Sequence, residues 1–310
     1  MSIRVHPWFR YFFMKLSEMR EWLDKRDIQL TKSLGQNFLH DAHQLQRIVE
    51  AAVLTKADKV LEIGPGLGPL TELLIERAGE VLAIEKDARL VAVLRERFDW
   101  ERSAGLRPGD PTDDADTPGR RPALQLLHDD ALEFIRRERR DWRDWKLVAN
   151  LPYSVASPIL VELALSPQRP TQMTVTLQFE VAQRLMAKAD DDDYGVLTLL
   201  VQLDYEPRDW FKIPASCFFP SPDVDSACVT LVRRAEPLLA EELHAAFVKI
   251  VKRAFSQRRK MMLKLLRTEW PLEKLQAAFA TLSISPQERA EKLSLEQFAE
   301  LTKLLTVAAK

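Results

Sequence analysis

Between Lys59 and Phe179 the chain alternates short apolar runs with stretches of helical periodicity. The apolar runs have the length of strands that are buried on both faces, and the stretches between them have the spacing of amphipathic helices. The predicted strands are residues 59–63, 80–85, 124–129, 145–149 and 173–179, and the predicted helices are residues 70–77, 88–98, 131–138 and 158–165. Strands that alternate with helices in this way predict a doubly wound α/β domain with a parallel sheet.

The pattern changes on either side of this region. Beyond residue 234 the strand signals stop, and helices are predicted at residues 241–255, 258–266, 272–282 and 295–307. Residues 103–122, rich in Gly, Pro and Asp, and the four aspartates at 190–193 predict exposed loops. We therefore predict an N-terminal extension (1–28), an α/β domain (29–234) and a small helical domain (235–310). In the extension, Trp22 and Leu23 suggest an amphipathic helix that packs on the main domain or on a partner.

Charge and composition narrow the function classes. The net charge of −1 leaves no overall field that would attract nucleic acid, so any such contact must be local. Cys217 and Cys228 are too few for a disulfide framework and lack the spacing of a metal site, which predicts reduced, buried thiols. The histidines do not form an HExxH motif, and we expect no metal. No apolar run reaches the roughly 18 residues that span a bilayer, so we expect a soluble, cytoplasmic protein without membrane contact.

The tetrapeptide Asn150-Leu151-Pro152-Tyr153 follows directly on a predicted buried strand. One function that suits an amide, a rigid turn and an aromatic ring at this place is the methylation of a planar base such as adenine. The exocyclic amine of adenine is a poor nucleophile, and a site that methylates it needs oxygen atoms that accept hydrogen bonds from the NH2 group. The Asn150 side chain and the Leu151 carbonyl are suitable acceptors, Pro152 turns the chain, and the Tyr153 ring can lie against a base. An ordinary strand-to-turn junction would also use Asn and Pro, and the tetrapeptide alone does not decide between the two interpretations.

A glycine-rich turn follows the first predicted strand, with glycines at 64, 66 and 68. Glycine lets the backbone turn tightly and approach a ligand closely. About 20 residues further on, Glu85 closes the next strand, where an acidic side chain often binds ribose hydroxyls. The spacing departs from GxGxxG, and Asp129 and Asp130 end the third strand, where a carboxylate can accept from an adenine amine; both details favour S-adenosylmethionine over a nicotinamide. Asp130 also suits a helix N-cap, and Glu62 a structural hydrogen bond.

From Leu30 onward the chain resembles the small-subunit ribosomal RNA adenine dimethyltransferase family. The motifs that carry the resemblance occur in the family's order: SLGQNFL (33–39), the glycine turn (64–68), Glu85, DAL (130–132), NLPY (150–153), FFPSPDVDS (218–226) and FSQRRK (255–260). The resemblance implies a Rossmann-like class I S-adenosylmethionine-dependent methyltransferase domain and a helical rRNA-binding domain. The extension, a long 103–122 loop and Ala149, where the family often has Gly, depart from the family pattern.

The resemblance also implies roles for individual residues. The cofactor would be contacted by Asn37, Leu39, Gly64, Glu85, Asp130 and Asn150. Tyr153 and Phe218 would sandwich a flipped adenine, whose amine donates to Asn150 and Leu151. The product would be N6,N6-dimethyladenosine at two adjacent positions near the 3′ end of 16S rRNA. The partner would be small-subunit rRNA in a pre-30S particle, and we expect a monomer.

Residues 249–267 contain eight basic side chains and no acidic one. Local positive charge of this kind neutralises phosphates, which predicts an RNA-binding surface. Its main residues are Lys252, Arg253, Arg258, Arg259 and Lys260. A solvated helix face is the simpler interpretation of such a run. Three functional alternatives stay open: an erythromycin-resistance type methyltransferase of large-subunit rRNA, a ribosome-assembly checkpoint factor, and a nicotinamide oxidoreductase.

Overall fold

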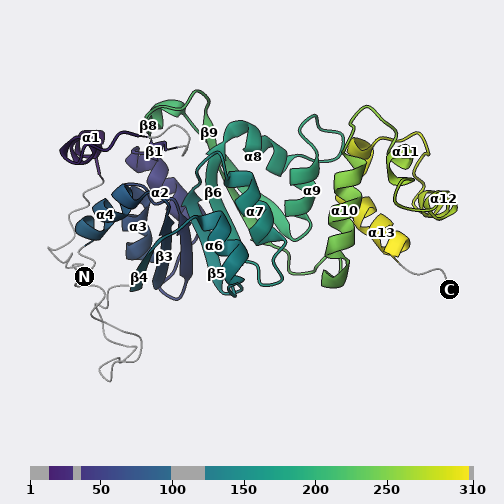
Figure 1. Ribbon diagram of the computed structural model, residues 1–310, viewed down its shortest axis with the longest axis horizontal. Helices are drawn as coiled ribbons and strands as arrows, with labels where there is room; N and C mark the ends of the chain where they lie inside the picture. The colour runs from purple at the N-terminus through teal and green to yellow at the C-terminus, as the bar shows by residue number, and fades with distance from the viewer. Residues whose placement is uncertain (1–13, 31–35, 99–122, 307–310) are drawn as a thin grey trace, which may run out of the picture.

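A computed structural model of the protein describes residues 14–30, 36–98 and 123–306. The predicted 103–122 loop, the start of the extension and residues 33–35 of the first motif lie outside the described residues. At the centre of the fold is a seven-stranded sheet with the order β4-β3-β2-β5-β6-β9-β7 (Figure 1). Its strands are β2 (Lys59–Ile63), β3 (Glu80–Glu85), β4 (Ala123–His128), β5 (Trp145–Asn150), β6 (Gln172–Gln178), β7 (Tyr205–Ile213) and β9 (Ser226–Arg233).

Helices cover both faces of this sheet, as predicted (Figure 1). On one face lie α2 (Ala42–Ala51), α3 (Pro69–Arg77) and α4 (Ala88–Arg97), and on the other α6 (Ala131–Glu138), α7 (Ala156–Ala164) and α8 (Phe179–Met186). The alternation of side chains along β3 shows why both faces must be covered, since Val81 packs with the first group and Leu82 with the second. Both residues are fully buried, and the strand is accordingly apolar from Val81 to Ile84.

The sheet is parallel from β4 to β6, and β9 runs antiparallel to both of its neighbours, β6 and β7. The predicted strand at 173–179 is slightly too long, because Phe179 is the first residue of α8. Between β7 and β9 the chain forms a short 3-10 turn at Ala215–Cys217 and the two-residue strand β8 (Phe218–Phe219). Residues 218–225, here called the proline loop, thus project from the carboxyl end of β7.

The N-terminal segment packs on the α/β domain. Helix α1 (Leu16–Lys25) buries Met19 and Leu23 in one cluster with Leu67 of the glycine turn. Strand β1 (Phe38–Leu39) pairs antiparallel with β8 of the proline loop. The amphipathic helix predicted in the extension is confirmed, and among the described residues its apolar face is covered by the main domain.

The remaining helices gather at one end of the molecule, at the right of Figure 1. They are α9 (Val196–Gln202), α10 (His244–Ala254), α11 (Met262–Leu266), α12 (Leu272–Thr281) and α13 (Leu295–Thr306), with short 3-10 turns at Glu241–Leu243 and Ala290–Lys292. The predicted helix 258–266 is wrong in its first half, since turns bring the chain to α11 and Lys260 N donates to Gln257 O. Leu199 and Leu200 of α9 share the core of these helices, so the boundary at 234 stays a prediction.

Three sequence-level expectations concern the whole chain. Cys217 and Cys228 are free and buried, as predicted. Within the described ranges, no helix has the length and apolar character to cross a membrane. In the same ranges, no three His, Cys, Asp or Glu side chains come together in a way that could hold a metal ion.

Candidate active site

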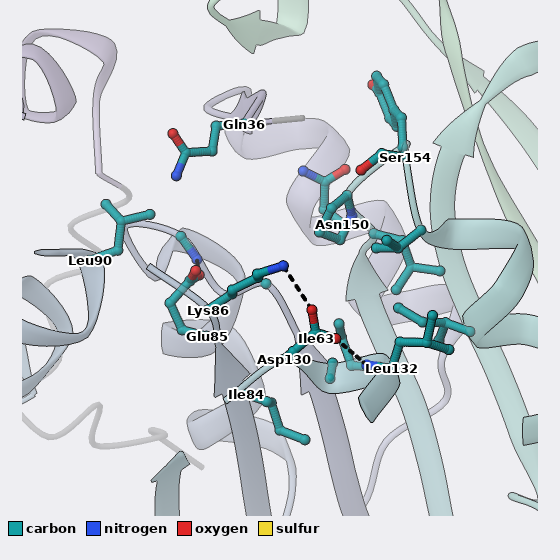
Figure 2. Close-up of a pocket in the computed structure, with 18 of the residues that line it drawn as sticks. Gln36, Ile63, Ile84, Glu85, Lys86, Leu90, Asp130, Leu132, Asn150 and Ser154 are labelled. Atoms are coloured by element: carbon teal, nitrogen blue, oxygen red, sulfur yellow. Dashed lines mark hydrogen bonds and ion pairs between the residues drawn. The ribbon is translucent and has the colours of Figure 1, made fainter. Parts of the chain in front are cut away.

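A cavity of about 210 Å³ lies at the carboxyl ends of β2, β3, β4 and β5 (Figure 2). This is the edge at which doubly wound sheets bind their ligands. Of the predicted site residues, those that line the cavity are Asn37, Gly64, Glu85, Asp130, Asn150, Leu151 and Tyr153. Residues 113 positions apart in the sequence therefore meet at one cavity, as the hydrogen bond from Asn150 Nδ2 to Asn37 O (2.9 Å) shows.

The glycine turn forms the floor between the strand ends. Gly64 and Gly66 have φ angles of 68° and 62°, a conformation that side chains disfavour. A Cβ atom on Gly64 would lie 3.1 Å from the Pro152 side chain, and one on Gly66 would lie 2.6 Å from the Phe38 ring. Glycine is required at both positions because the turn packs directly against the NLPY turn and against β1.

Glu85 connects the end of β3 to this turn. Its Oε2 accepts from Gly66 N (3.1 Å) and its Oε1 accepts from Asp87 N (2.9 Å). Burial raises the pKa of Glu85, while these two backbone donors act to lower it. The side chain is 6% exposed and is held in one orientation at the cavity wall. The carboxylate is thus a fixed acceptor at the position predicted for the ribose hydroxyls.

Asp130 begins α6 and faces the cavity from the next strand. Its Oδ1 accepts from Leu132 N (3.0 Å) and Glu133 N (3.2 Å), so the N-cap interpretation is confirmed. Its Oδ2 pairs with Lys86 Nζ at 2.8 Å (Figure 2). Lys86 is the first cause of the lowered pKa of Asp130, which keeps the carboxylate ionised. A carboxylate has further lone-pair sites, so the pair leaves it able to accept from a base amine.

Asn150 is the last residue of β5. Because its Nδ2 donates to Asn37 O, its Oδ1 must point the other way. That oxygen is buried and has no hydrogen-bond partner among the described residues. Buried acceptors without a partner are rare and costly, since each forfeits about 1–3 kcal/mol. Asn150 Oδ1 is therefore an acceptor held in place without a donor at the edge of a ligand-sized cavity.

Tyr153 contributes an aromatic ring to the same wall. The ring is half-buried, and its hydroxyl shares a hydrogen bond with Ser226 Oγ at 2.5 Å. Burial raises the pKa of Tyr153, so the phenol stays protonated near neutral pH. Leu151 lies between Asn150 and Tyr153 in the sequence. Its side chain is in the core, and its N–H donates to Thr176 O (3.0 Å).

Two predicted site residues lie away from the cavity. Leu39 and Phe218 face each other in the β1–β8 pair and are 2% and 3% exposed. Both belong to the apolar cluster under α2 and α3, and neither lines the cavity. The structure therefore brings Tyr153 but not Phe218 to the site, and the roles of Leu39 and Phe218 stay predictions.

Gln36, Lys86 and Ser226 are among the residues of the site that sequence reasoning missed. Gln36 and Lys86 line the cavity, and Gln36 Nε2 donates to Asp87 Oδ2 (3.0 Å). Ser226 holds Tyr153. Lys86 could have been found, because it directly follows a strand-end acid. Ser226 could not, because nothing in its spacing links it to a tyrosine 73 residues earlier.

The predicted RNA-binding residues differ in how they are engaged. Arg253 Nε donates to Leu265 O (2.9 Å), and Arg258 Nη2 donates to Asp192 O (2.7 Å). Lys252, Arg259 and Lys260 are exposed, and no ion pair is formed by them with any described residue. A second run of arginines lies at residues 136–143, and three of them are paired with acids: Arg136 with Glu162 (2.9 Å), Arg137 with Asp129 (2.7 Å) and Arg143 with Asp141 (2.6 Å). Cations that are open to a phosphate therefore lie at residues 252–260, in the last turn of α10 and in the segment that follows it.

A Rossmann-like sheet with this glycine turn and these strand-end acceptors defines a class I methyltransferase fold. Residues 28–307 match the family model described as ribosomal RNA adenine dimethylase. A protein of Clostridium perfringens named ribosomal RNA small subunit methyltransferase A is 37% identical over 285 residues, covering 91% of this chain and 93% of that protein. A protein of the same name from Geobacillus kaustophilus is 36% identical over 297 residues, covering 92% and 94%.

Solved structures agree with this placement. The 23S rRNA methyltransferase ErmE matches with a TM-score of 0.62 and 27% identity, covering 87% of this chain and 99% of that one. A dimethyladenosine transferase from Plasmodium falciparum shares the fold, with a TM-score of 0.67 and 23% identity, covering 85% and 95%. The chain belongs to the ribosomal RNA adenine dimethylase family.

Proposed function

We propose that this protein uses S-adenosylmethionine to methylate the N6 atoms of two adjacent adenosines near the 3′ end of 16S rRNA, giving N6,N6-dimethyladenosine during ribosome biogenesis. The observation that carries the proposal is the unpartnered Oδ1 of Asn150 beside the cavity. An exocyclic NH2 group is the donor that would complete it. The two curated relatives described above are named for the small subunit, which favours 16S rRNA over 23S rRNA.

The residues of the cavity fit the proposed cofactor. Glu85 presents fixed carboxylate oxygens for ribose hydroxyls, and Asp130 an ionised carboxylate for a base amine. Gly64 lets the main chain approach the methionine part of the cofactor. Asn37 lines the same cavity and accepts a hydrogen bond from Asn150 through its main-chain oxygen. When bound, the cofactor supplies an electrophilic methyl group on a sulfonium. The protein's part is to hold the two reactants in line and to exclude other geometries.

The target adenine would bind at the other end of the cavity, away from Glu85 and Asp130. There Asn150 Oδ1 and the Leu151 carbonyl would accept from its amine, and the Tyr153 ring would lie against the base. A stacked adenine cannot reach the cavity, so the nucleotide must be flipped out of its helix. These acceptors stabilise the charge that develops on the amine, and no general base is needed because the methylated nitrogen is acidic. Two transfers use up both N–H bonds, so the reaction stops at the dimethyl product.

We place the rRNA contact on Lys252, Arg259 and Lys260, with Arg253 and Arg258 beside them. Replacing any one of the first three by Ala should reduce the slope of log affinity against log salt by about 1. Lys249→Ala is the matched control, because Lys249 is already paired with Glu269 at 2.8 Å. Filter binding to small-subunit rRNA measures the slopes. Equal slopes for all four variants and wild type would show that these residues do not contact the rRNA.

One experiment tests the reaction itself. The protein is incubated with labelled S-adenosylmethionine and undermethylated small or large subunits, and the nucleosides are identified by mass spectrometry. Dimethyladenosine at two adjacent 16S positions is expected. Dimethyladenosine in 23S rRNA would identify the large-subunit alternative, and RNA binding without methylation the checkpoint alternative. A thermal shift with nicotinamide cofactors but not with S-adenosylhomocysteine would favour the oxidoreductase. The pre-30S substrate, monomeric state and cytoplasmic location belong to the same proposal.

A further inference from the structure

One hydrogen bond joins two motifs that lie far apart in the sequence. Tyr153, from the NLPY turn, and Ser226, the last residue of the FFPSPDVDS motif, share a hydrogen bond of 2.5 Å between Oη and Oγ. Tyr153 lines the cavity, whereas Ser226 is fully buried and lies outside it. The bond therefore connects a side chain at the cavity wall to a point inside the fold.

The Ser226 end of this bond is held rigidly. Ser226 is the first residue of β9 and pairs with Gln178 of β6 on one side and Ile213 of β7 on the other. Its neighbour Asp225 is fixed as well, because its Oδ1 accepts from Ala215 N (2.9 Å) and its Oδ2 pairs with Lys212 Nζ (2.7 Å). The hydroxyl group of Ser226 thus has a position that two strands and the base of the proline loop determine together.

This anchor decides which part of Tyr153 is available to a ligand. A tyrosine side chain turns about two torsions, and a tether at its far end restricts both. With the hydroxyl engaged by Ser226, the face of the ring is what Tyr153 can offer to the cavity. Because burial keeps the phenol protonated, the hydroxyl serves to hold the ring and carries no charge.

We propose that Ser226 is a positioning residue, which fixes the plane of the Tyr153 ring against which the target base is placed for methyl transfer. The proposal rests on the proposed function, because it assigns the base to the Tyr153 side of the cavity. It also gives a physical reason why the FFPSPDVDS motif ends on a serine. A ring fixed before the base arrives saves the ordering that binding would otherwise require.

The test removes the bond from each side and then from both. Ser226→Ala, Tyr153→Phe and the double variant are compared with wild type on undermethylated small subunits. Each single variant should lower kcat by roughly three- to tenfold, with KM and S-adenosylhomocysteine affinity within about twofold of wild type. The double variant should be no slower than either single variant, because all three lack the same bond.

The product ratio separates positioning from simple loss of stability. A looser ring slows the chemical step but not the release of the RNA, so more of the monomethylated base should leave before its second transfer. N6-methyladenosine should therefore accumulate relative to the dimethyl product at equal total methylation. This ratio does not depend on the fraction of folded enzyme. Tyr205→Phe is the matched control: it removes another buried tyrosine bond, to Pro170 O at 2.6 Å, away from the cavity. It should lower the melting temperature and leave the product ratio unchanged.

The outcomes are distinguishable. If Ser226→Ala does not fold, Tyr153→Phe removes the same bond from the other side and carries the test. A wild-type product ratio in the folded variants, or single effects that multiply in the double variant, would overturn the role of Ser226. If the wild-type protein itself forms no dimethyladenosine, the proposed function fails, and that result is separate from this one.

Discussion

The two ends of the cavity differ in how their acceptors are satisfied. At the end proposed for the cofactor, Glu85 accepts from two backbone N–H groups, and Asp130 from two more and from Lys86. At the end proposed for the target base, the buried Oδ1 of Asn150 has no partner in the described part of the chain. Acceptors that are already paired hold their geometry in the free protein. An unpaired one lowers stability and gains its partner only when a donor arrives.

The largest effect is expected at the unpaired acceptor. Asn150→Ala removes Oδ1 from the target amine and should lower kcat by about 10²–10³-fold, the usual loss for one acceptor or donor aimed at developing charge. Affinity for S-adenosylhomocysteine should fall much less, since the acceptors proposed for its ribose and base are Glu85 and Asp130. Single-turnover methylation and calorimetry measure the two quantities.

Asn150→Asp sharpens this prediction. It keeps an oxygen toward the base but loses the donor to Asn37 O, so it separates the acceptor from the tether. Wild-type turnover in Asn150→Ala would contradict the role of the amide oxygen. The unpaired acceptor would then have no part in binding the target base.

The next effect is expected at the satisfied end. In Glu85→Gln one of the two backbone donors, Gly66 N or Asp87 N, would face an NH2 group. We expect S-adenosylhomocysteine affinity to fall about 10- to 100-fold, equivalent to about 1.5–3 kcal/mol for hydrogen bonds to a charged group. Glu80→Gln, at the opposite end of β3, is the matched control and should bind normally. Unchanged affinity in Glu85→Gln would show that this carboxylate does not hold the cofactor.

The sequence predicted the strand ends and the glycine turn better than the contacts that β8 and β9 make. Strand ends and the glycine turn can be recognised locally, because buried parallel strands are continuous apolar runs and a tight turn demands glycine. The target end depends on long-range pairing: β8 carries Phe218 into the core beside Leu39, and β9 places Ser226 against Tyr153. The antiparallel strands that create these contacts leave no local signal of their partners, which is why Ser226 was missed.

A smaller effect is expected for Lys86, which satisfies Asp130 Oδ2 at 2.8 Å. Lys86 is the main cause of the lowered pKa of Asp130, so in Lys86→Met that pKa should rise toward its ordinary value. A protonated Asp130 loses the ionised acceptor for the base amine, so cofactor affinity should be lost at a higher pH as the solution is acidified. At pH 7 we expect affinity within about threefold of wild type, because Asp130 is ionised in both proteins.

Calorimetry with S-adenosylhomocysteine from pH 7 to pH 4 measures this difference. Glu85 titrates in both proteins, so the difference between the two curves isolates Asp130. Lys146→Met removes a lysine ion pair outside the cavity, to Asp58 at 3.1 Å, and should follow the wild-type curve. Superimposable curves for Lys86→Met and wild type would show that Asp130 does not bind the base through its charge.

Glu62 tests the contrast between the two ends directly, since its Oε2 is also buried without a partner among the described residues, close to the glycine turn. It does not line the cavity, and burial raises its pKa to about 8, so at neutral pH it is mostly a neutral acid inside the fold. The folded state then binds a proton more tightly than the unfolded chain. The free energy of unfolding should therefore fall as the pH rises from about 4.5 to 8, by up to about 1.4 kcal/mol per pH unit.

Glu62→Gln should remove this dependence of the unfolding free energy on pH, measured by urea unfolding at several pH values. It should leave S-adenosylhomocysteine affinity unchanged. If Glu62→Gln instead lost S-adenosylhomocysteine affinity, as Glu85→Gln should, the unpaired Glu62 oxygen would contribute to cofactor binding. Unpaired acceptors would then occur at both ends of the cavity and would not distinguish the target end.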